Sequence, residues 1–360
     1  MMVAIFWFIL ILFILVLAHE FGHFWTARKM GMGVEEFGIG FPPRIWSWKD
    51  KLGTTWSLNI IPLGGFVKIE GENSHDELTP TSFGGKRKSA RALVLVAGVV
   101  MNMVLASGLY MVGFGFGLPT ILNGEVPNGA RVTNRSVRVI EVHPNSSAMQ
   151  AGILTGDRIV SVNGVGYQLS EQARAAFKPL PPETTVTLLV ERASEELSFE
   201  LTPARLEGLE IDGVGVALMD TGKVHYAWYL APFMGIVAAF RLAGEMVVTL
   251  GVLIAGLFSG NGVEGGLAGP VGIAVITGEV AKLGLGHILQ FAAALSVNLA
   301  VLNILPIPAL DGGRLLFLAI EAIRGKPLKK GVEGTVHSLG FLALIILIIG
   351  VTYGDIIKLF

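Results

Sequence analysis

The sequence of 360 residues predicts a polytopic α-helical membrane protein with about four transmembrane helices, one inserted α+β domain and a membrane-associated β-hairpin on the cytoplasmic side. Hydrophobic residues make up 52% of the chain and charged residues 15%, whereas soluble domains carry about 25% charged residues. Several uncharged runs are long enough to cross a hydrocarbon core of roughly 30 Å. The net charge of −1 argues against nucleic acid as a partner, and the lack of cysteine excludes disulfides and thiol catalysis.

Four apolar runs are the predicted transmembrane helices: residues 1–27, 92–118, 283–323 and 336–354. A cleaved signal peptide is the alternative for the first run, but that run lacks a basic start and a small-residue cleavage site. Pro306 and Pro308 interrupt the third run. Because proline lacks a backbone N–H and clashes with the preceding turn, we expect this helix to be broken within the membrane.

A fifth apolar stretch, residues 227–258, carries Arg241 and Glu245 at its centre. Each apolar half has about a dozen residues, fewer than the roughly 20 that a span needs. We therefore expect an interfacial or partly re-entrant helix, followed by a connecting loop that ends at residue 282. A spanning helix stays open as the alternative.

Charge bias predicts the sides of the membrane. Residues 28–91 contain ten Lys or Arg, and Arg324, Lys326, Lys329 and Lys330 form a second basic loop. Basic loops face the cytoplasm, so the acidic segment 120–222 is expected outside, as are both termini. This count works only if residues 227–258 do not cross. Ser259 to Glu264 should then lie on the same side as the inserted domain.

Residues 120–222 are the predicted inserted domain. Strands are expected at residues 137–142, 158–163, 184–192 and 197–201, with a short helix at 144–152 that ends on a glycine. Ala151-Gly152-Ile153-Leu154 and Gly156-Asp157-Arg158-Ile159 resemble PDZ domains, and the length suits one of them.

The cytoplasmic-side loop, residues 28–91, carries the predicted hairpin. Thr54 to Ile61 and Phe66 to Glu70 have the composition of strands, and Pro62-Leu63-Gly64-Gly65 has that of a turn. The expectation is a hairpin that dips toward the membrane, with an ordinary cytoplasmic hairpin as the alternative.

His19-Glu20-Phe21-Gly22-His23 forms an HExxH motif near the inner end of the first helix. His19 and His23 lie one helical turn apart and face the same way, as two zinc ligands must. Glu20 is beside them, where it can take a proton from water, and is assigned as the catalytic residue. The alternative is a pair of hydrogen-bonded structural histidines. It is disfavoured because a glutamate and two histidines in an apolar helix are costly.

A catalytic zinc needs a third protein ligand and one open position. Asp311, which follows the two prolines, is the best candidate. Taken alone, Asp311 could equally be the N-cap of the next helix, 314–323. Because a zinc ion bound by the HExxH motif needs a third protein ligand, we favour Asp311 as that ligand. Glu245, Glu279 and Glu321 are weaker candidates without a supporting motif.

Five segments in order resemble the site-2 protease family, in its bacterial branch with an extracytoplasmic PDZ domain. They are HEFGHFWTA (19–27), EFGIGFPP (36–43), PLGGFVKIEGE (62–72), LAGPVGIA (267–274) and NILPIPALDGG (303–313). Two features depart from the family. There is room for one PDZ domain where better-known members have two. Ala97-Gly98-Val99 stands where Ala-Gly-Pro is frequent, with Asn102 in place.

The resemblance implies an intramembrane zinc endopeptidase of the bacterial inner membrane. His19, His23 and Asp311 would bind one zinc ion near the cytoplasmic side, and Glu20 would catalyse hydrolysis. Substrates would be transmembrane segments of single-pass proteins, such as anti-sigma factors or signal-peptide remnants. Membrane lipid surrounds the chain, and the PDZ domain would bind a peptide C-terminus or act as a size filter. The substrate, the cut site, the first-cut protease and the oligomeric state do not follow from the sequence.

The resemblance also implies where substrate is held. Candidate substrate-binding residues are Asn298 and Asn303, beside the helix break, and a membrane-re-entrant strand element comprising Gly64, Gly65, Phe66, Val67, Lys68 and Ile69. Two rival functions are a membrane-anchored zinc protease that cuts cytoplasmic or loop segments, and a non-catalytic PDZ scaffold. The first usually takes its third ligand from a glutamate, and the second would not need an intact HExxH with Asp311.

Overall fold

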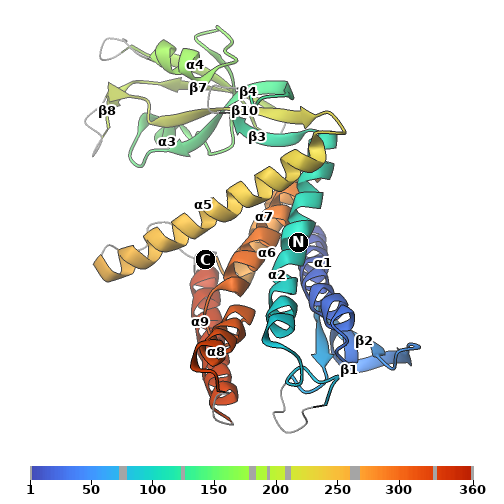
Figure 1. The fold of residues 1–360 in the computed structure, drawn as a ribbon. Helices are drawn as coiled ribbons and strands as arrows, with labels where there is room; N and C mark the ends of the chain where they lie inside the picture. The colour runs from blue at the N-terminus through green and yellow to red at the C-terminus, as the bar shows by residue number, and fades with distance from the viewer. Residues whose placement is uncertain are drawn as a thin grey trace. The chain divides into compact units, whose positions relative to one another are not determined.

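The computed structural model describes residues 2–72, 79–122, 126–177, 184–192, 195–206, 212–259, 268–326 and 331–357. The chain divides into two compact units (Figure 1). The helical unit comprises residues 1–113 and 232–360, and the β-rich unit comprises residues 114–231.

The helical unit contains α1 (Met2–Lys29), α2 (Lys88–Phe116), α5 (Ala231–Ser259), α6 (Pro270–Lys282), α7 (Leu285–Ile304), α8 (Asp311–Arg324) and α9 (Val332–Ile357). Within the described residues, five helices are long and apolar enough to cross a membrane: α1, α2, α5, α7 and α9. Large apolar side chains are exposed along α9, among them Phe341, Ile346 and Ile349. Helices that expose apolar side chains in this way are typical of a polytopic membrane protein.

Helix α5 differs from the expectation of two short apolar halves. It is one continuous helix, and Arg241 pairs with Glu245 one turn away at 2.9 Å. The expectation that the two charged residues divide this segment into two short apolar halves is therefore wrong. Arg241 and Glu245 pair with each other, and the helix continues through them. Figure 1 shows α5 inclined to α2 and α7 rather than parallel to them. The expected connecting loop up to residue 282 contains α6, which begins on Pro270. Asn261 to Glu264, for which a side of the membrane was predicted, lie outside the described residues.

The third apolar run is broken, as its prolines predict. Helix α7 ends at Ile304 and α8 begins at Asp311. Two glycines let α8 start this close to the break. A Cβ at Gly312 would lie 2.1 Å from Leu305 O, and one at Gly313 would lie 2.4 Å from Ile307 O. The close approach explains why glycines follow Asp311.

The predicted hairpin between residues 54–61 and 66–70 is wrong in its pairing. Strand β1 (Val34–Lys49) pairs with β2 (Thr55–Ile69), and both predicted hairpin strands belong to β2. Residues 34–39 of β1 are matched with 69–65, and residues 36–39 also with 55–58, so this part of β1 separates the two predicted strands. Residues 44–49 are matched with 59–55. The directly paired hairpin turn lies instead at Asp50–Gly53, where the Asp50 carboxylate accepts hydrogen bonds from Leu52 N and Thr54 N at 2.9 and 3.1 Å.

Gly64 explains what the predicted turn does. Its φ is 105°, and the chain reverses around it, because residues 55–58 and 65–69 run in opposite directions on the two sides of residues 36–39. At the Asp50 turn, an aspartate side chain closes the loop on its own backbone, and Gly53 takes a φ of 87°. The extended β1 then offers partners to both halves of β2.

The β-rich unit is α+β. Its main sheet has the order β3 (Leu118–Leu122), β10 (Val216–Tyr226), β4 (Ala130–Val142), β5 (Arg158–Val162), β6 (Val186–Arg192) and β7 (Glu195–Leu201). Two short helices, α3 (Ser147–Ala151) and α4 (Ser170–Phe177), and a small sheet of β8 (Ala204–Arg205) and β9 (Asp212–Gly213) complete it. Val137, Ile159, Leu188 and Leu218 are fully buried and form its own core. The predicted short helix ends as expected, with Gly152 at a φ of 88°.

Candidate active site

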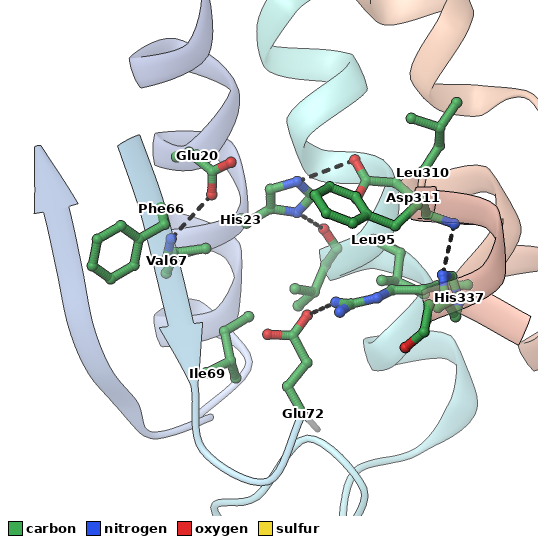
Figure 2. A pocket seen from close by; sticks show the side chains of 15 residues that line it. Glu20, His23, Phe66, Val67, Ile69, Glu72, Leu95, Leu310, Asp311 and His337 are labelled. Carbon is green, nitrogen blue, oxygen red and sulfur yellow. Dashed lines mark hydrogen bonds and ion pairs between the residues drawn. The ribbon is translucent and has the colours of Figure 1, made fainter. Parts of the chain in front are cut away.

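Three of the predicted residues meet in the helical unit. His19 and His23 lie on α1, and Asp311 lies in the first turn of α8. Figure 2 shows His23 facing Asp311. The Nε2 atoms of the two histidines lie 3.0 and 3.3 Å from Asp311 Oδ2, and 3.2 Å from each other. One ligand atom of each residue lies within 4.8 Å of the others, so the three side chains could hold one metal ion.

The N-cap interpretation of Asp311 is wrong. The N-cap of α8 is Leu310, and no side chain caps the helix there. The Asp311 carboxylate turns toward the two imidazoles instead.

Helix α2 orients both imidazoles. His23 Nδ1 donates to Val94 O at 2.8 Å, which leaves its Nε2 lone pair facing Asp311. His19 Nδ1 lies 3.2 Å from the amide of Asn102, a fully buried residue. Among the described residues, Asn102 Oδ1 has no hydrogen-bond partner. If the amide is turned over, Oδ1 accepts from His19 Nδ1–H and the histidine proton is satisfied.

This donor set fits a metal ion. Two imidazoles and one carboxylate are a common zinc ligand set, and each histidine has a partner for its other nitrogen. Asp311 Oδ2 is buried and, apart from the imidazoles, has no partner among the described residues. An oxygen buried in this way is expected to meet a cation.

Glu20 lies in the same pocket but outside the ligand group. Its Oε2 accepts a hydrogen bond from Val67 N at 3.1 Å, which ties α1 to β2 (Figure 2). The pocket has a volume of about 510 Å³. It is lined by Glu20, His23, Phe66, Val67, Ile69, Glu72, Val94, Leu95, Ala309, Leu310, Asp311, Arg314, His337, Ser338 and Phe341. The Glu20 carboxylate thus shares one cavity with His23 and Asp311.

The predicted substrate-binding strand is only partly at the pocket. Phe66, Val67 and Ile69 line it, whereas Lys68 pairs with Glu35 at 2.6 Å on the exposed face. Gly64 and Gly65 pack against α1: a Cβ would lie 3.0 Å from Val16 Cγ1 at the first and 3.9 Å from Glu20 Cγ at the second.

Asn298 and Asn303 lie half-buried on α7, and neither lines the pocket. Their role in substrate binding stays a prediction.

Several site residues were not predicted. Asn102 and Gly98 contact the imidazoles, Arg314 pairs with Glu72 at the pocket, and His337 lines it. An asparagine inside an uncharged helix is a detectable signal, because polar residues in such helices usually make specific hydrogen bonds. The contacts of Arg314 and His337 join segments far apart in sequence, and no local pattern indicates them.

Comparisons with known proteins agree with this site. The family model for peptidase family M50 matches residues 7–347. A protein of Agrobacterium fabrum named as a zinc metalloprotease is 34% identical over 98% of this chain and 95% of its own length. Zinc metalloprotease RasP of Geobacillus kaustophilus is 31% identical over 98% of this chain and 97% of its own. The regulator of sigma-E protease RseP of Escherichia coli is 30% identical over 98% of each.

Among solved structures, a PDZ domain of an SdrC-like protein from Listeria monocytogenes covers 24% of this chain and 92% of its own length. Its identity is 18% and its TM-score 0.22, a likeness too weak to carry an argument about the β-rich unit. The family match spans every residue of the metal-ligand group, and the relatives cover nearly the whole chain. The chain therefore belongs to peptidase family M50, the site-2 proteases, and is a zinc metalloendopeptidase of that type.

Proposed function

We propose that this enzyme holds one zinc ion with His19, His23 and Asp311 and hydrolyses peptide bonds within transmembrane segments of single-pass membrane proteins. The observation that carries the proposal is the position of the site: both histidines and Glu20 lie on α1, a helix long and apolar enough to span a membrane. We further propose anti-sigma factors or signal-peptide remnants as the substrate type. The name of the Escherichia coli relative, a regulator of sigma-E protease, supports the first of these.

The residues divide the chemistry among them. A zinc ion held by the three ligands would polarise the scissile carbonyl and make water a better nucleophile. Glu20 accepts the proton of the attacking water and delivers it to the nitrogen of the leaving amine. The hydrogen bond from Val67 N fixes the Glu20 carboxylate in the pocket until substrate arrives. Val94 O and Asn102 hold the two imidazoles in the orientation that leaves Nε2 available.

The second half of β2 offers a place for an unwound substrate. Residues 65–69 pair with β1 on one side, and the sheet contains no other described strand. Glu70 N donates to Gly33 O on the β1 side, whereas Val67 N points away from β1 toward Glu20. Because amides alternate along a strand, those of residues 65, 67 and 69 face the open edge. A substrate strand paired there would satisfy backbone groups that cannot stay unpaired in lipid.

Helix packing around the site supports one placement in the membrane. Ile11 and Leu15 of α1 pack on Ile288 and Ala292 of α7, and further along both segments His19 and His23 meet Asp311. Helices α1 and α7 therefore run in the same direction, and the chain between α2 and α7 must cross the membrane an even number of times. Helix α6 has 13 residues, fewer than the roughly 20 of a span, which supports an α5 that does not cross.

Charge bias then favours a cytoplasmic position for the loop with β1 and β2, and a position outside the bacterial inner membrane for the β-rich unit. We propose the β-rich unit as the PDZ domain that the sequence resembles. Its position outside would let it act on the extracytoplasmic part of a substrate, by binding a C-terminus or excluding bulky domains.

The first prediction tests the reaction. Purified protein is incubated with a panel of single-pass segments, with and without a zinc chelator, and the products are mapped by mass. Cleavage within the apolar segments should stop on chelation. Glu20→Gln should lose activity at least about a hundredfold while it keeps bound zinc, because it lacks only the proton acceptor. Glu245→Gln, an exposed glutamate on α5, is the matched control. Cleavage confined to the polar flanks of the segments, or full activity of Glu20→Gln, would contradict the proposal.

A further inference from the structure

The segment between α7 and α8, residues 305–310, carries a strained backbone position next to the metal-ligand group. Ala309 has a φ of 80°, in the left-handed region that a non-glycine residue seldom adopts. Asp311 follows two residues later. A conformation of this kind persists only when neighbouring groups hold it in place.

Two residues on one face of α9 hold this segment. Ala309 N donates a hydrogen bond to His337 Nδ1 at 2.8 Å (Figure 2). One turn further on, α9 touches Pro308 at Gly340, where a Cβ would lie 2.4 Å from Pro308 Cβ and 2.8 Å from Pro308 O. The body of α8 has its own anchors, Arg314 with Glu72 and Glu321 with Arg91. The contacts of α9 are instead with Pro308 and Ala309, in the loop that precedes α8.

The hydrogen bond defines the state of the His337 ring. Nδ1 accepts, so in the neutral ring the proton is on Nε2. That nitrogen is buried, and among the described residues it has no hydrogen-bond partner. His337, which lines the pocket, therefore has two separable features: an acceptor that holds Ala309, and a second, buried nitrogen.

We infer that His337, packed beside Gly340, is a positioning residue that holds Ala309 in its strained conformation and thereby keeps Asp311 within reach of His19 and His23. The inference rests on the proposed zinc site. The acceptor carries the role, because it is the atom that contacts the loop.

Asparagine and glutamine separate the two nitrogens of His337. In His337→Asn the new amide oxygen would lie the same number of bonds from Cβ as Nδ1, whereas in His337→Gln the polar atoms would lie near the place of Nε2. Zinc affinity is measured on the full chain in detergent by competition with a colorimetric chelator, and folding by thermal unfolding. His337→Gln and His337→Ala should release zinc about tenfold more readily, the lower range for partners that orient metal ligands. His337→Asn should stay near wild type.

The glycines of α9 supply an independent pair. Gly340→Ala should weaken zinc binding because its methyl group displaces Pro308. Gly334→Ala on the same helix, where a Cβ meets nothing within 4 Å, should not. Equal zinc affinity in all variants would overturn the role of His337 and leave the proposed function standing. The same would follow if His337→Gln kept its zinc affinity and His337→Asn lost it. Wild-type protein that binds no zinc would overturn the proposed function itself.

Discussion

Gly98 of α2 determines how closely the two imidazoles approach that helix. A Cβ there would lie 2.4 Å from His23 Nε2 and 2.6 Å from His19 Cε1, so only glycine lets the two imidazoles lie against α2. The same helix contacts α1 at Gly22, where a Cβ would lie 2.4 Å from Ala97 O. Small residues at both positions bring the backbones together, as they often do between membrane helices.

Gly98→Ala should therefore displace both imidazoles and lower zinc affinity at least about tenfold, with a matching loss of proteolysis. Gly108→Ala on the same helix is the control, because a Cβ there meets nothing within 4 Å. Bound zinc is measured by mass spectrometry under native conditions. Full zinc occupancy in Gly98→Ala would show that the imidazoles coordinate from another position.

At the scale of elements, β2 is the strand that the substrate proposal depends on. Proline at Val67 or Ile69 removes an N–H that faces the open edge, and proline is tolerated on edge strands. Both variants should lose most proteolysis and keep zinc and folding. Proline at Phe66 or Lys68 removes an N–H that faces β1, so it should instead weaken the β1–β2 sheet. The readouts are cleavage rate and protease resistance of residues 34–69. Equal proteolytic activity in all four variants would contradict the proposal that substrate pairs with the open edge of β2.

Strand β5 begins beside a buried ion pair that makes the β-rich unit sensitive to pH. Burial alone would raise the pKa of Asp157, but hydrogen bonds from Arg192 and from Leu154 N outweigh it and hold that pKa below its usual value. The Arg192 guanidinium lies 2.7 Å from Asp157 Oδ2. As pH falls, the unfolded chain takes up the proton first. The stabilisation is complete above the unfolded pKa of about 4 and is lost as pH falls through the folded pKa.

Arg192→Gln should lower the free energy of unfolding of this unit by about 1–3 kcal/mol at pH 7, the cost of a lost hydrogen bond to a buried charge. The difference from wild type should shrink below about pH 4, where the unfolded chain is protonated. Hydrogen exchange of the β5 and β6 amides, followed by mass spectrometry from acid to neutral pH, gives the protection of each variant. Arg205→Gln, an exposed arginine on β8, is the control. A difference independent of pH would mean that Arg192 acts through packing alone.

At the scale of the whole molecule, the order in which the helices cross the membrane can be tested by labelling. If α5 does not cross, Ala268 lies on the same side of the membrane as the β-rich unit. The chain has no cysteine, so single cysteines at Ala268, at Glu141 of β4 and at Lys51 of the β1–β2 turn can be labelled one at a time. An impermeant thiol reagent on intact cells should label the first two, and Lys51→Cys only after permeabilisation. Protection of Ala268→Cys would show that α5 spans and that the proposed order is wrong.

The membrane class, the histidine pair and the helix break could all be predicted from the amino-acid sequence. These features depend on local rules: the length of an apolar run, the 3.6-residue helical period, and the missing N–H of proline. Asp311 followed because a metal with two histidine ligands needs a third, and only one motif offered it. The predicted strand at residues 66–70 also exists, since alternation along a strand is local.

Tertiary structure decided what those features contact. Turn chemistry is present at both Asp50–Gly53 and Pro62–Gly65. Tertiary pairing alone placed residues 36–39 of β1 between the two strands that flank the second turn, whereas the strands that flank the first pair with each other. Asn102 lies 83 positions from His19, and Arg314 lies 242 from Glu72. Contacts of this kind depend on which faces meet after the chain packs, and a local pattern carries no information about a distant face. The grouping of His19, His23 and Asp311 was therefore predictable, whereas the residues that hold these side chains in place were not.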